Sequence, residues 1–269
     1  MAALKKGICE GCIPGHGLPE RLKAARAAGY DGVEPTFHRS GEGLLHIAAT
    51  RAEVETLRDM VRSAGLEAPS VMCGAALADA ALLSADPTVR ARGVENLKAA
   101  LQRAAWLGAD TILIHPGHLA ADRRYDAAFD DLLLALRGLR QACDDTGVGL
   151  AVENVWNRFL LSPREMRELV DAVDHPLIGA YFDVGNVLLF GYSAQWIEIL
   201  GRRVRKVHVK DFQRQVGTGA GFCQLLDGDA DYPKVMAALR ATGYDDYLTS
   251  EVSGDITETA QRLDAILKM

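Results

Sequence analysis

The feature that most constrains the fold is the regular alternation of short apolar segments with longer amphipathic ones along the 269 residues. The apolar segments are rich in β-branched residues and predict strands, at 6–9, 32–34, 68–73, 111–115, 149–153, 178–183, 204–210 and 247–251. The amphipathic segments predict helices at 18–28, 51–64, 87–107, 127–144, from 163, near 194–200, near 232–241 and from 256. Apolar strands that alternate with helices predict a parallel sheet covered on both faces.

Eight strand–helix units favour a closed (β/α)8 barrel, which makes residues 1–269 a single α/β domain. An open, doubly wound sheet is the alternative, but the chain has no Gly-rich dinucleotide-binding turn. Long irregular segments at 35–49 and 212–230 follow the second and seventh predicted strands. Because a barrel builds its active site from the loops after its strands, these two segments are expected near the site.

Composition argues against several classes of partner. A hydrophobic content of 49% and a charged content of 25% are ordinary for a globular protein. The net charge of −6 argues against nucleic acid, whose binding depends on clustered Lys and Arg. The sequence shows neither a signal peptide nor an apolar run long enough to span a bilayer, so no membrane role is expected. Five scattered cysteines indicate reduced thiols and a cytoplasmic location.

Metal-competent side chains stand at the carboxyl ends of four predicted strands, and they are Glu153, Asp183, His208 and Glu251. In a barrel these four ends converge on one mouth. Three converging carboxylates repel one another, and a divalent cation removes that conflict. Oxygen ligands with one nitrogen and no thiolate suit Mn²⁺, Mg²⁺ or Co²⁺ better than structural zinc. In the alternative interpretation, no metal is bound and each of the four side chains accepts hydrogen bonds from the backbone amides of its own loop.

Several motifs carry a family resemblance, and they are ENVWNRF at 153–159, YFDVGN at 181–186, VHVKD at 207–211, SE at 250–251 and HPG at 115–117. Together they resemble the xylose-isomerase-like TIM-barrel superfamily, and most closely its sugar and sugar-phosphate 3-epimerases. The resemblance implies that Glu153, Asp183, His208 and Glu251 bind one divalent metal ion, with Mn²⁺ preferred and Mg²⁺, Co²⁺ or Zn²⁺ as alternatives. It also implies that Glu153 and Glu251 form the acid/base pair, and that the protein is a homodimer or homotetramer.

The implied reaction has a physical rationale. Epimerisation beside a ketone removes a weakly acidic C–H proton from one face and returns a proton to the other. A divalent cation that holds the carbonyl and hydroxyl oxygens stabilises the enediolate, typically by several kcal/mol. Glu153 and Glu251 can exchange the roles of base and acid on its two sides. The expected substrate is therefore a small ketose or ketose phosphate.

Six residues near the predicted mouth are candidates for substrate contact. His115, Asn186 and Glu34 could hydrogen-bond hydroxyl groups, Trp156 could form an apolar wall, and Lys210 and Arg158 could meet a phosphate. Ordinary structural roles are the alternative for each of them. Tagatose-type epimerases commonly carry His at the position of Asn186 and Glu at the position of Leu160, so the resemblance is greater to the sugar-phosphate branch.

Three rival functions remain open. An inosose-dehydratase-like lyase would use the same enolate and then lose a hydroxyl group. An endonuclease IV-like DNA-repair enzyme would need further histidines that this chain lacks, for example at Asn186. A sugar-binding barrel without catalysis is the third, although the two glutamates of the proton-transfer pair are present.

Overall fold

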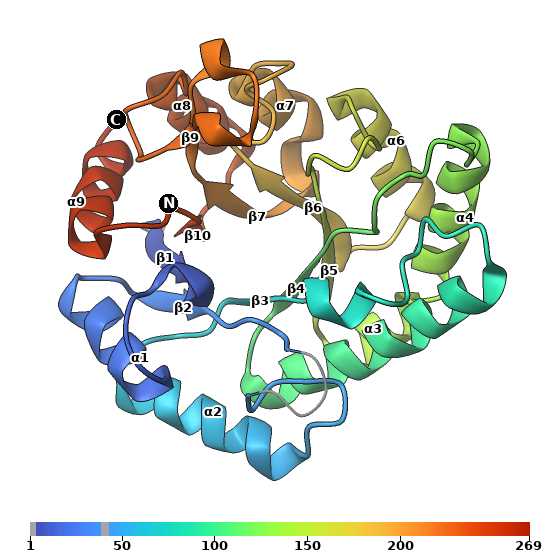
Figure 1. Cartoon of the computed structure of the whole chain (residues 1–269), viewed down its shortest axis with the longest axis horizontal. Helices are drawn as coiled ribbons and strands as arrows, with labels where there is room; N and C mark the ends of the chain where they lie inside the picture. The colour runs from blue at the N-terminus through green and yellow to red at the C-terminus, as the bar shows by residue number, and fades with distance from the viewer. Residues whose placement is uncertain (1–3, 39–42) are drawn as a thin grey trace.

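The fold is an eight-stranded parallel barrel surrounded by helices, and the computed structural model describes residues 4–38 and 43–269 (Figure 1). The barrel strands are β1 (Lys5–Cys9), β2 (Gly32–Glu34), β3 (Ser70–Met72), β4 (Thr111–Ile114), β5 (Gly149–Glu153), β6 (Ile178–Asp183), β7 (Val204–Val209) and β10 (Tyr247–Ser250). They follow the order β2-β1-β10-β7-β6-β5-β4-β3. Parallel bridges between Gly32 and Glu67 and between Thr36 and Met72 join the two ends of this order. The predicted barrel is confirmed.

Helices follow the strands and form the outer ring in Figure 1. They are α1 (Leu18–Ala27), α2 (Arg51–Ser63), α3 (Pro87–Leu107), α4 (Tyr125–Arg137), α5 (Arg140–Thr146), α6 (Pro163–Val173), α7 (Ser193–Leu200), α8 (Tyr232–Thr242) and α9 (Ile256–Leu267). Ser162 caps α6 in a reciprocal capping box with Glu165, and Pro163 is its first residue. No helix within residues 4–38 and 43–269 is long and apolar enough to cross a membrane.

Two predicted segments differ from the structure. The helix expected at 127–144 is divided into α4 and α5, because the Leu139 amide bonds to the Leu136 carbonyl three residues back instead of continuing the α-helical pattern. Gly138 stands at this break and weakens the helix there. The segment 212–230 is not wholly irregular, since β9 (Phe222–Cys223) lies within it and pairs antiparallel with β8 (Asp211–Phe212), which ends at the first residue of the segment. Of the expected loop at 35–49, residues 39–42 lie outside the described residues.

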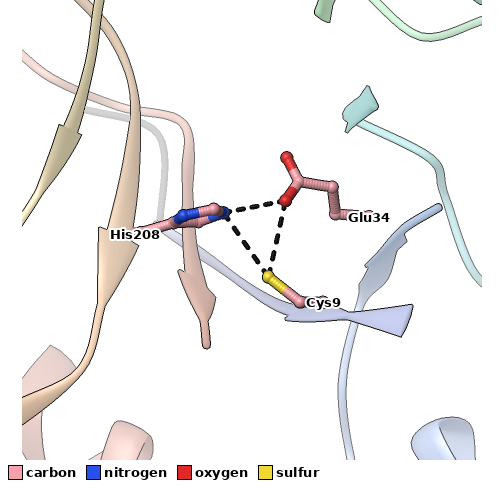
Figure 2. A group of neighbouring side chains, drawn as sticks. All are labelled: Cys9, Glu34 and His208. Carbon is pink, nitrogen blue, oxygen red and sulfur yellow. Dashed lines mark hydrogen bonds and ion pairs between the residues drawn. The ribbon is translucent and has the colours of Figure 1, made fainter. Parts of the chain in front are cut away.

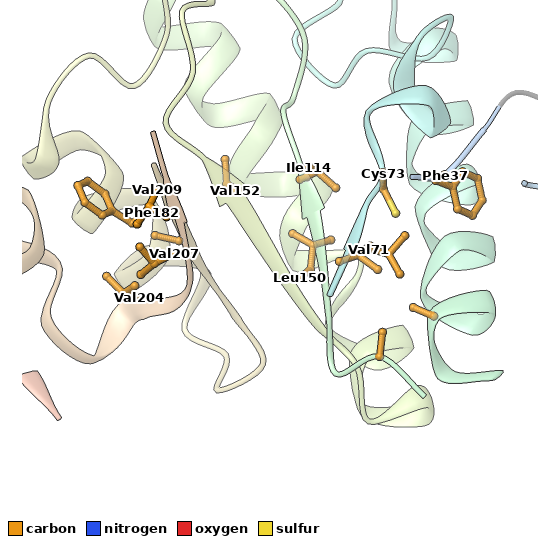
Figure 3. Packing of buried hydrophobic residues seen from close by; sticks show 14 of the residues in the cluster. Phe37, Val71, Cys73, Ile114, Leu150, Val152, Phe182, Val204, Val207 and Val209 are labelled. Carbon is orange, nitrogen blue, oxygen red and sulfur yellow. The ribbon is translucent and has the colours of Figure 1, made fainter. Parts of the chain in front are cut away.

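Alternation along the strands separates two buried layers. Leu150 and Val152 of β5 and Val207 and Val209 of β7 belong to the large core between the barrel and the helices (Figure 3). Their neighbour Ala151 packs instead in a small separate cluster with Leu113 and Tyr181. Because side chains of a strand alternate between its faces, this second set lines the barrel interior. The same alternation places Glu153, Asp183 and His208 on the interior side.

Asp211 anchors the loop that follows β7. Its buried carboxylate accepts hydrogen bonds from the amides of Phe212 and Ala230 on Oδ1 and from the amide of Leu226 on Oδ2. Gly228 permits this close approach, since a Cβ there would lie 2.2 Å from Asp211 Oδ1. One carboxylate therefore ties both ends of the loop to the barrel.

We expect the substitution Asp211→Asn to destabilise the protein by about 1–3 kcal/mol, because its amide NH₂ would face at least one backbone N–H donor and leave it unsatisfied. Urea unfolding measures this loss, with Asp130→Asn on the exposed surface of α4 as the matched control. A loss no larger than that of the control would show that Asp211 does not anchor the loop.

Candidate metal centre

Four side chains converge at the carboxyl ends of neighbouring strands. Glu153 ends β5, Asp183 ends β6, His208 lies one residue before the end of β7, and Glu251 directly follows β10. These strands are consecutive in the barrel, in the order β10-β7-β6-β5. Each of the four residues offers one ligand atom, and the four atoms lie within 4.8 Å of one another. The structure thus brings together the four strand-end residues that the sequence singled out.

Two asparagines hold Asp183 in place. The Asn154 side chain bonds the Asp183 backbone twice, receiving its N–H and donating to its carbonyl, each at 2.9 Å. The backbone amide of Asn186 donates to Asp183 Oδ1 at 2.7 Å. Because Oδ1 is occupied in this way, Oδ2 is left to face the other side chains of the cluster.

The donor set has the character of a cation site. Asp183 Oδ2 and His208 Nδ1 are buried and make no hydrogen bond within the described chain. They lie 4.0 Å apart, and His208 Nδ1 lies 3.5 Å from an oxygen of Glu153 and 3.5 Å from one of Glu251. Buried polar atoms are normally satisfied, so these two, which face a shared space without a hydrogen bond, fit a bound divalent cation. Asp183 Oδ2 has one charged neighbour, the Lys210 ammonium at 3.3 Å.

Lys210 neutralises part of this cluster. Its ammonium donates to Glu251 Oε2 at 2.6 Å and lies 3.3 Å from Asp183 Oδ2. Burial raises the pKa of Asp183 to about 7, Lys210 opposes that rise, and Glu153 and Glu251 add to it by repulsion. Burial acts to raise the pKa of Glu251 as well, but His208 and Lys210 outweigh it, and the net shift is downward. The lysine expected at a substrate phosphate is therefore paired with carboxylates in this structure.

We expect Lys210→Met to tighten the binding of Mn²⁺ by at least about tenfold, because a positive charge next to two of the candidate ligands is removed. The same change should lower the stability of the metal-free protein, since it leaves the carboxylates without their cation. Calorimetric titration with Mn²⁺ and thermal unfolding measure the two effects. Lys234→Met, on an exposed helix position, is the control, and an unchanged or weaker affinity in Lys210→Met would contradict this role.

Glu34 lies inside the barrel, beneath the candidate metal ligands, and is completely buried. Its Oε2 lies 2.8 Å from His208 Nε2, and Cys9 Sγ lies 3.4 Å from both atoms (Figure 2). Its Oε1 receives hydrogen bonds from Ser70 Oγ at 2.5 Å and from Tyr181 Oη at 2.8 Å. A carboxylate enclosed by the protein in this way does not have the position expected for a substrate contact.

The other candidate residues lie around the mouth. Trp156 packs against Phe212 and Phe222, and its indole N–H donates to the Asn186 carbonyl at 2.8 Å. The buried side chain of Asn186 donates to the Asn154 carbonyl at 3.0 Å and approaches Glu153 Oε1 at 3.4 Å. His115 is half-buried, and the absence of a side chain at Gly74 gives its ring room.

A cavity of about 550 Å³ opens between the segments that follow β5 and β6. Trp156, Asn186 and the exposed Arg158 line it, together with apolar residues such as Leu161 and Phe190. Arg158 adopts a left-handed backbone conformation with φ of 63°. The Arg158 side chain is exposed at the edge of this cavity.

Cys9, Ser70 and Tyr181 belong to the buried network around the site, and sequence reasoning did not select them. Each is a polar or thiol-bearing residue inside an apolar strand, and Tyr181 stands two positions before Asp183. Alternation therefore places Tyr181 and Asp183 on the same side of β6. Its spacing of two residues from Asp183 was therefore the signal that could have identified Tyr181 from the sequence.

The fold and this cluster define a class, namely an α/β barrel with a candidate cation centre at the carboxyl ends of its strands. The model of the family described as xylose isomerase-like TIM barrel matches residues 22–269. The chain belongs to this family, as the sequence motifs predicted.

Several of the proteins that this chain resembles are sugar 3-epimerases. L-ribulose-5-phosphate 3-epimerase UlaE of Salmonella paratyphi A is 28% identical over 244 residues, which cover 88% of this chain and 83% of that protein. Among solved structures, a D-tagatose 3-epimerase-like protein superposes with a TM-score of 0.83 at 20% identity, over 98% of this chain and 97% of that one. An L-ribulose 3-epimerase superposes with a TM-score of 0.80 at 18% identity, over 98% and 93%. At these identities the solved structures show the shared fold.

Proposed function

We propose that this protein is a metal-dependent isomerase that epimerises the carbon beside the ketone of a ketose or ketose phosphate. The observation that carries the proposal is the cluster of Glu153, Asp183, His208 and Glu251, in which two buried ligand atoms make no hydrogen bond to any residue of 4–38 or 43–269. The likeness to a ribulose-phosphate 3-epimerase over most of both chains supports the choice of reaction and substrate class. The five free cysteines fit a reducing compartment such as the cytoplasm.

In this proposal Glu153, Asp183, His208 and Glu251 hold one divalent cation. Three carboxylates and one imidazole suit Mn²⁺, with Mg²⁺ or Co²⁺ as alternatives. Bound there, the cation would stabilise the negative charge that develops on the substrate oxygens, typically by several kcal/mol.

The two glutamates carry the proton transfer in this proposal. They extend from β5 and β10, which are separated in the barrel by β6 and β7, so a small substrate can lie between them. One carboxylate removes the proton of the carbon beside the ketone, and the other returns a proton to the opposite face. His208 and Lys210 lower the pKa of Glu251, which favours the ionised carboxylate that a base requires. Trp156, Phe212 and Phe222 pack together as an apolar cluster next to Lys210, whose ammonium lies 5.2 Å from the centre of the Phe222 ring. In this proposal the cluster limits the access of water to the site.

The proposal is tested by incubating the Mn²⁺-loaded protein with L-ribulose 5-phosphate, L-ribulose and D-tagatose, and by separating the products chromatographically. Formation of the 3-epimer of at least one substrate is the expected result. A preference for the phosphate ester that falls in Arg158→Gln would place the phosphate near the exposed guanidinium. Absence of every epimer would contradict the proposal, and a product that has lost water would point to a dehydratase.

A further inference from the structure

The two nitrogens of His208 face different surroundings. Nδ1 faces the carboxylates of Glu153 and Glu251, as described above. Nε2 faces Glu34 Oε2 at 2.8 Å, and both side chains are fully buried (Figure 2). The Tyr181 ring lies 4.4 Å from the imidazole, centroid to centroid, and restricts how the ring can turn. Which nitrogen keeps a proton therefore decides which one can serve as a ligand.

The Glu34 carboxylate acts as a hydrogen-bond acceptor in its contacts with neighbouring side chains. Both of its oxygens receive hydrogen bonds from other side chains, with the Ser70 and Tyr181 hydroxyls donating to Oε1 and the Cys9 thiol donating to Oε2. A carboxylate that receives these donors is also the acceptor at the 2.8 Å contact, so the hydrogen there belongs to His208 Nε2. Ser70 and Tyr181 occupy the other oxygen and hold the carboxylate in this orientation.

Cys9, Glu34 and His208 do not form a second cation site of their own. Two ligands of a tetrahedral ion at bond lengths of about 2.0–2.1 Å lie roughly 3.3 Å apart. Glu34 Oε2 and His208 Nε2 are 2.8 Å apart, which is the length of a hydrogen bond. Cys9 Sγ donates to the same carboxylate oxygen. The contact in Figure 2 is therefore a hydrogen-bonded support for the imidazole.

We propose that Glu34 is a positioning residue for the candidate metal centre, which keeps a proton on His208 Nε2 and so presents Nδ1 to Glu153, Asp183 and Glu251. This inference rests on the proposed metal site and adds a residue that touches neither substrate nor cation. Partners of this kind commonly change metal affinity by about 10–100-fold. Glu34 thereby gains a role different from the substrate contact expected for it.

Two substitutions at Glu34 test the proposal by different routes. Glu34→Gln removes the charge at nearly constant volume, and Glu34→Met removes the acceptor. In Glu34→Met the hydroxyl groups of Ser70 and Tyr181, 3.2 Å apart, can still pair with each other. Tyr181→Phe is the matched control, because it removes one hydrogen bond to Glu34 and leaves the contact between Glu34 and His208.

The measurements are calorimetric titration with Zn²⁺, which is diamagnetic, and ¹H–¹⁵N NMR of the ¹⁵N-labelled histidine rings with His208→Asn for assignment. In the wild type we expect a proton on Nε2 of His208 with Zn²⁺ bound. Zn²⁺ affinity should fall by about 10–100-fold in both Glu34 variants, and by less in Tyr181→Phe. Circular dichroism identifies the variants that are folded at the titration temperature.

Zn²⁺ affinities within about twofold of the wild type in both folded Glu34 variants would overturn the inference. A wild-type His208 without a proton on Nε2 would do the same. Neither the Zn²⁺ titration nor the histidine NMR experiment uses a sugar. Both results can therefore be interpreted even if the protein shows no epimerase activity. Normal epimerase activity together with unchanged Zn²⁺ affinity in the Glu34 variants would contradict the role of Glu34 and leave the proposed epimerase function intact.

Discussion

Glu153→Gln and Glu251→Gln are each expected to reduce epimerisation by about 10²–10⁴-fold, the range typical of a lost general acid or base. Each amide keeps the shape of the side chain and one oxygen but cannot carry the proton. The loss should appear in kcat, because proton transfer occurs in the chemical step. Initial rates with a ketose that the wild type epimerises measure the effect.

Glu198→Gln, at an exposed position of α7, is the matched control and should keep wild-type rates. Both active-site variants must be assayed at a Mn²⁺ concentration that saturates them, since each also removes a candidate ligand. A metal-saturated variant with more than about a tenth of the wild-type kcat would contradict its assignment as an acid/base residue.

Asp183→Asn is expected to abolish most of the stabilisation that the metal ion gives to the fold. An ion at 100 times its dissociation constant stabilises a protein by about 2.7 kcal/mol, and a 100-fold loss of affinity reduces this to about 0.4 kcal/mol. Asp183 is the natural choice, because it is completely buried and its Oδ2 has no hydrogen-bond partner within the described chain. Urea unfolding with and without Mn²⁺ measures the difference.

The metal-free Asp183→Asn protein should be at least as stable as the metal-free wild type, because the substitution removes a charge whose burial is unfavourable. Asp130→Asn should retain the full Mn²⁺ effect. If Mn²⁺ stabilises Asp183→Asn as strongly as it stabilises the wild type, Asp183 is not a ligand.

The barrel could be predicted because its signals are local. Apolar strands and amphipathic helices can each be recognised from a short stretch of sequence. Ser162 and Pro163, for example, mark the start of α6 in the sequence alone. The sequence predicted the ends of some strands less accurately, because a single residue can determine where a strand begins. The strand expected from residue 68 begins at Ser70, directly after Pro69, which has no N–H for the parallel ladder.

The site was predictable in part, for a similar reason. Residues at strand ends are visible in the sequence, and the barrel topology brings Glu153, Asp183 and Glu251 together. The partners of Glu34 depend on contacts between residues 36 and 174 positions apart, which no local pattern contains. The same limit applies to Lys210, whose pairing with Glu251 depends on the neighbouring positions of β7 and β10.

The most direct test of the account is solvent exchange in deuterated water. Mn²⁺-loaded wild-type protein is incubated with ketoses and ketose 5-phosphates, the metal ion is removed, and deuterium at each carbon is followed by NMR. Deuterium is expected at the carbon beside the ketone with the wild type, and it is expected to be lost in whichever variant, Glu153→Gln or Glu251→Gln, lacks the base for the configuration of the sugar supplied. Epimer formation without deuterium incorporation, or no exchange with any sugar by a protein that binds the metal, would contradict proton transfer at this site.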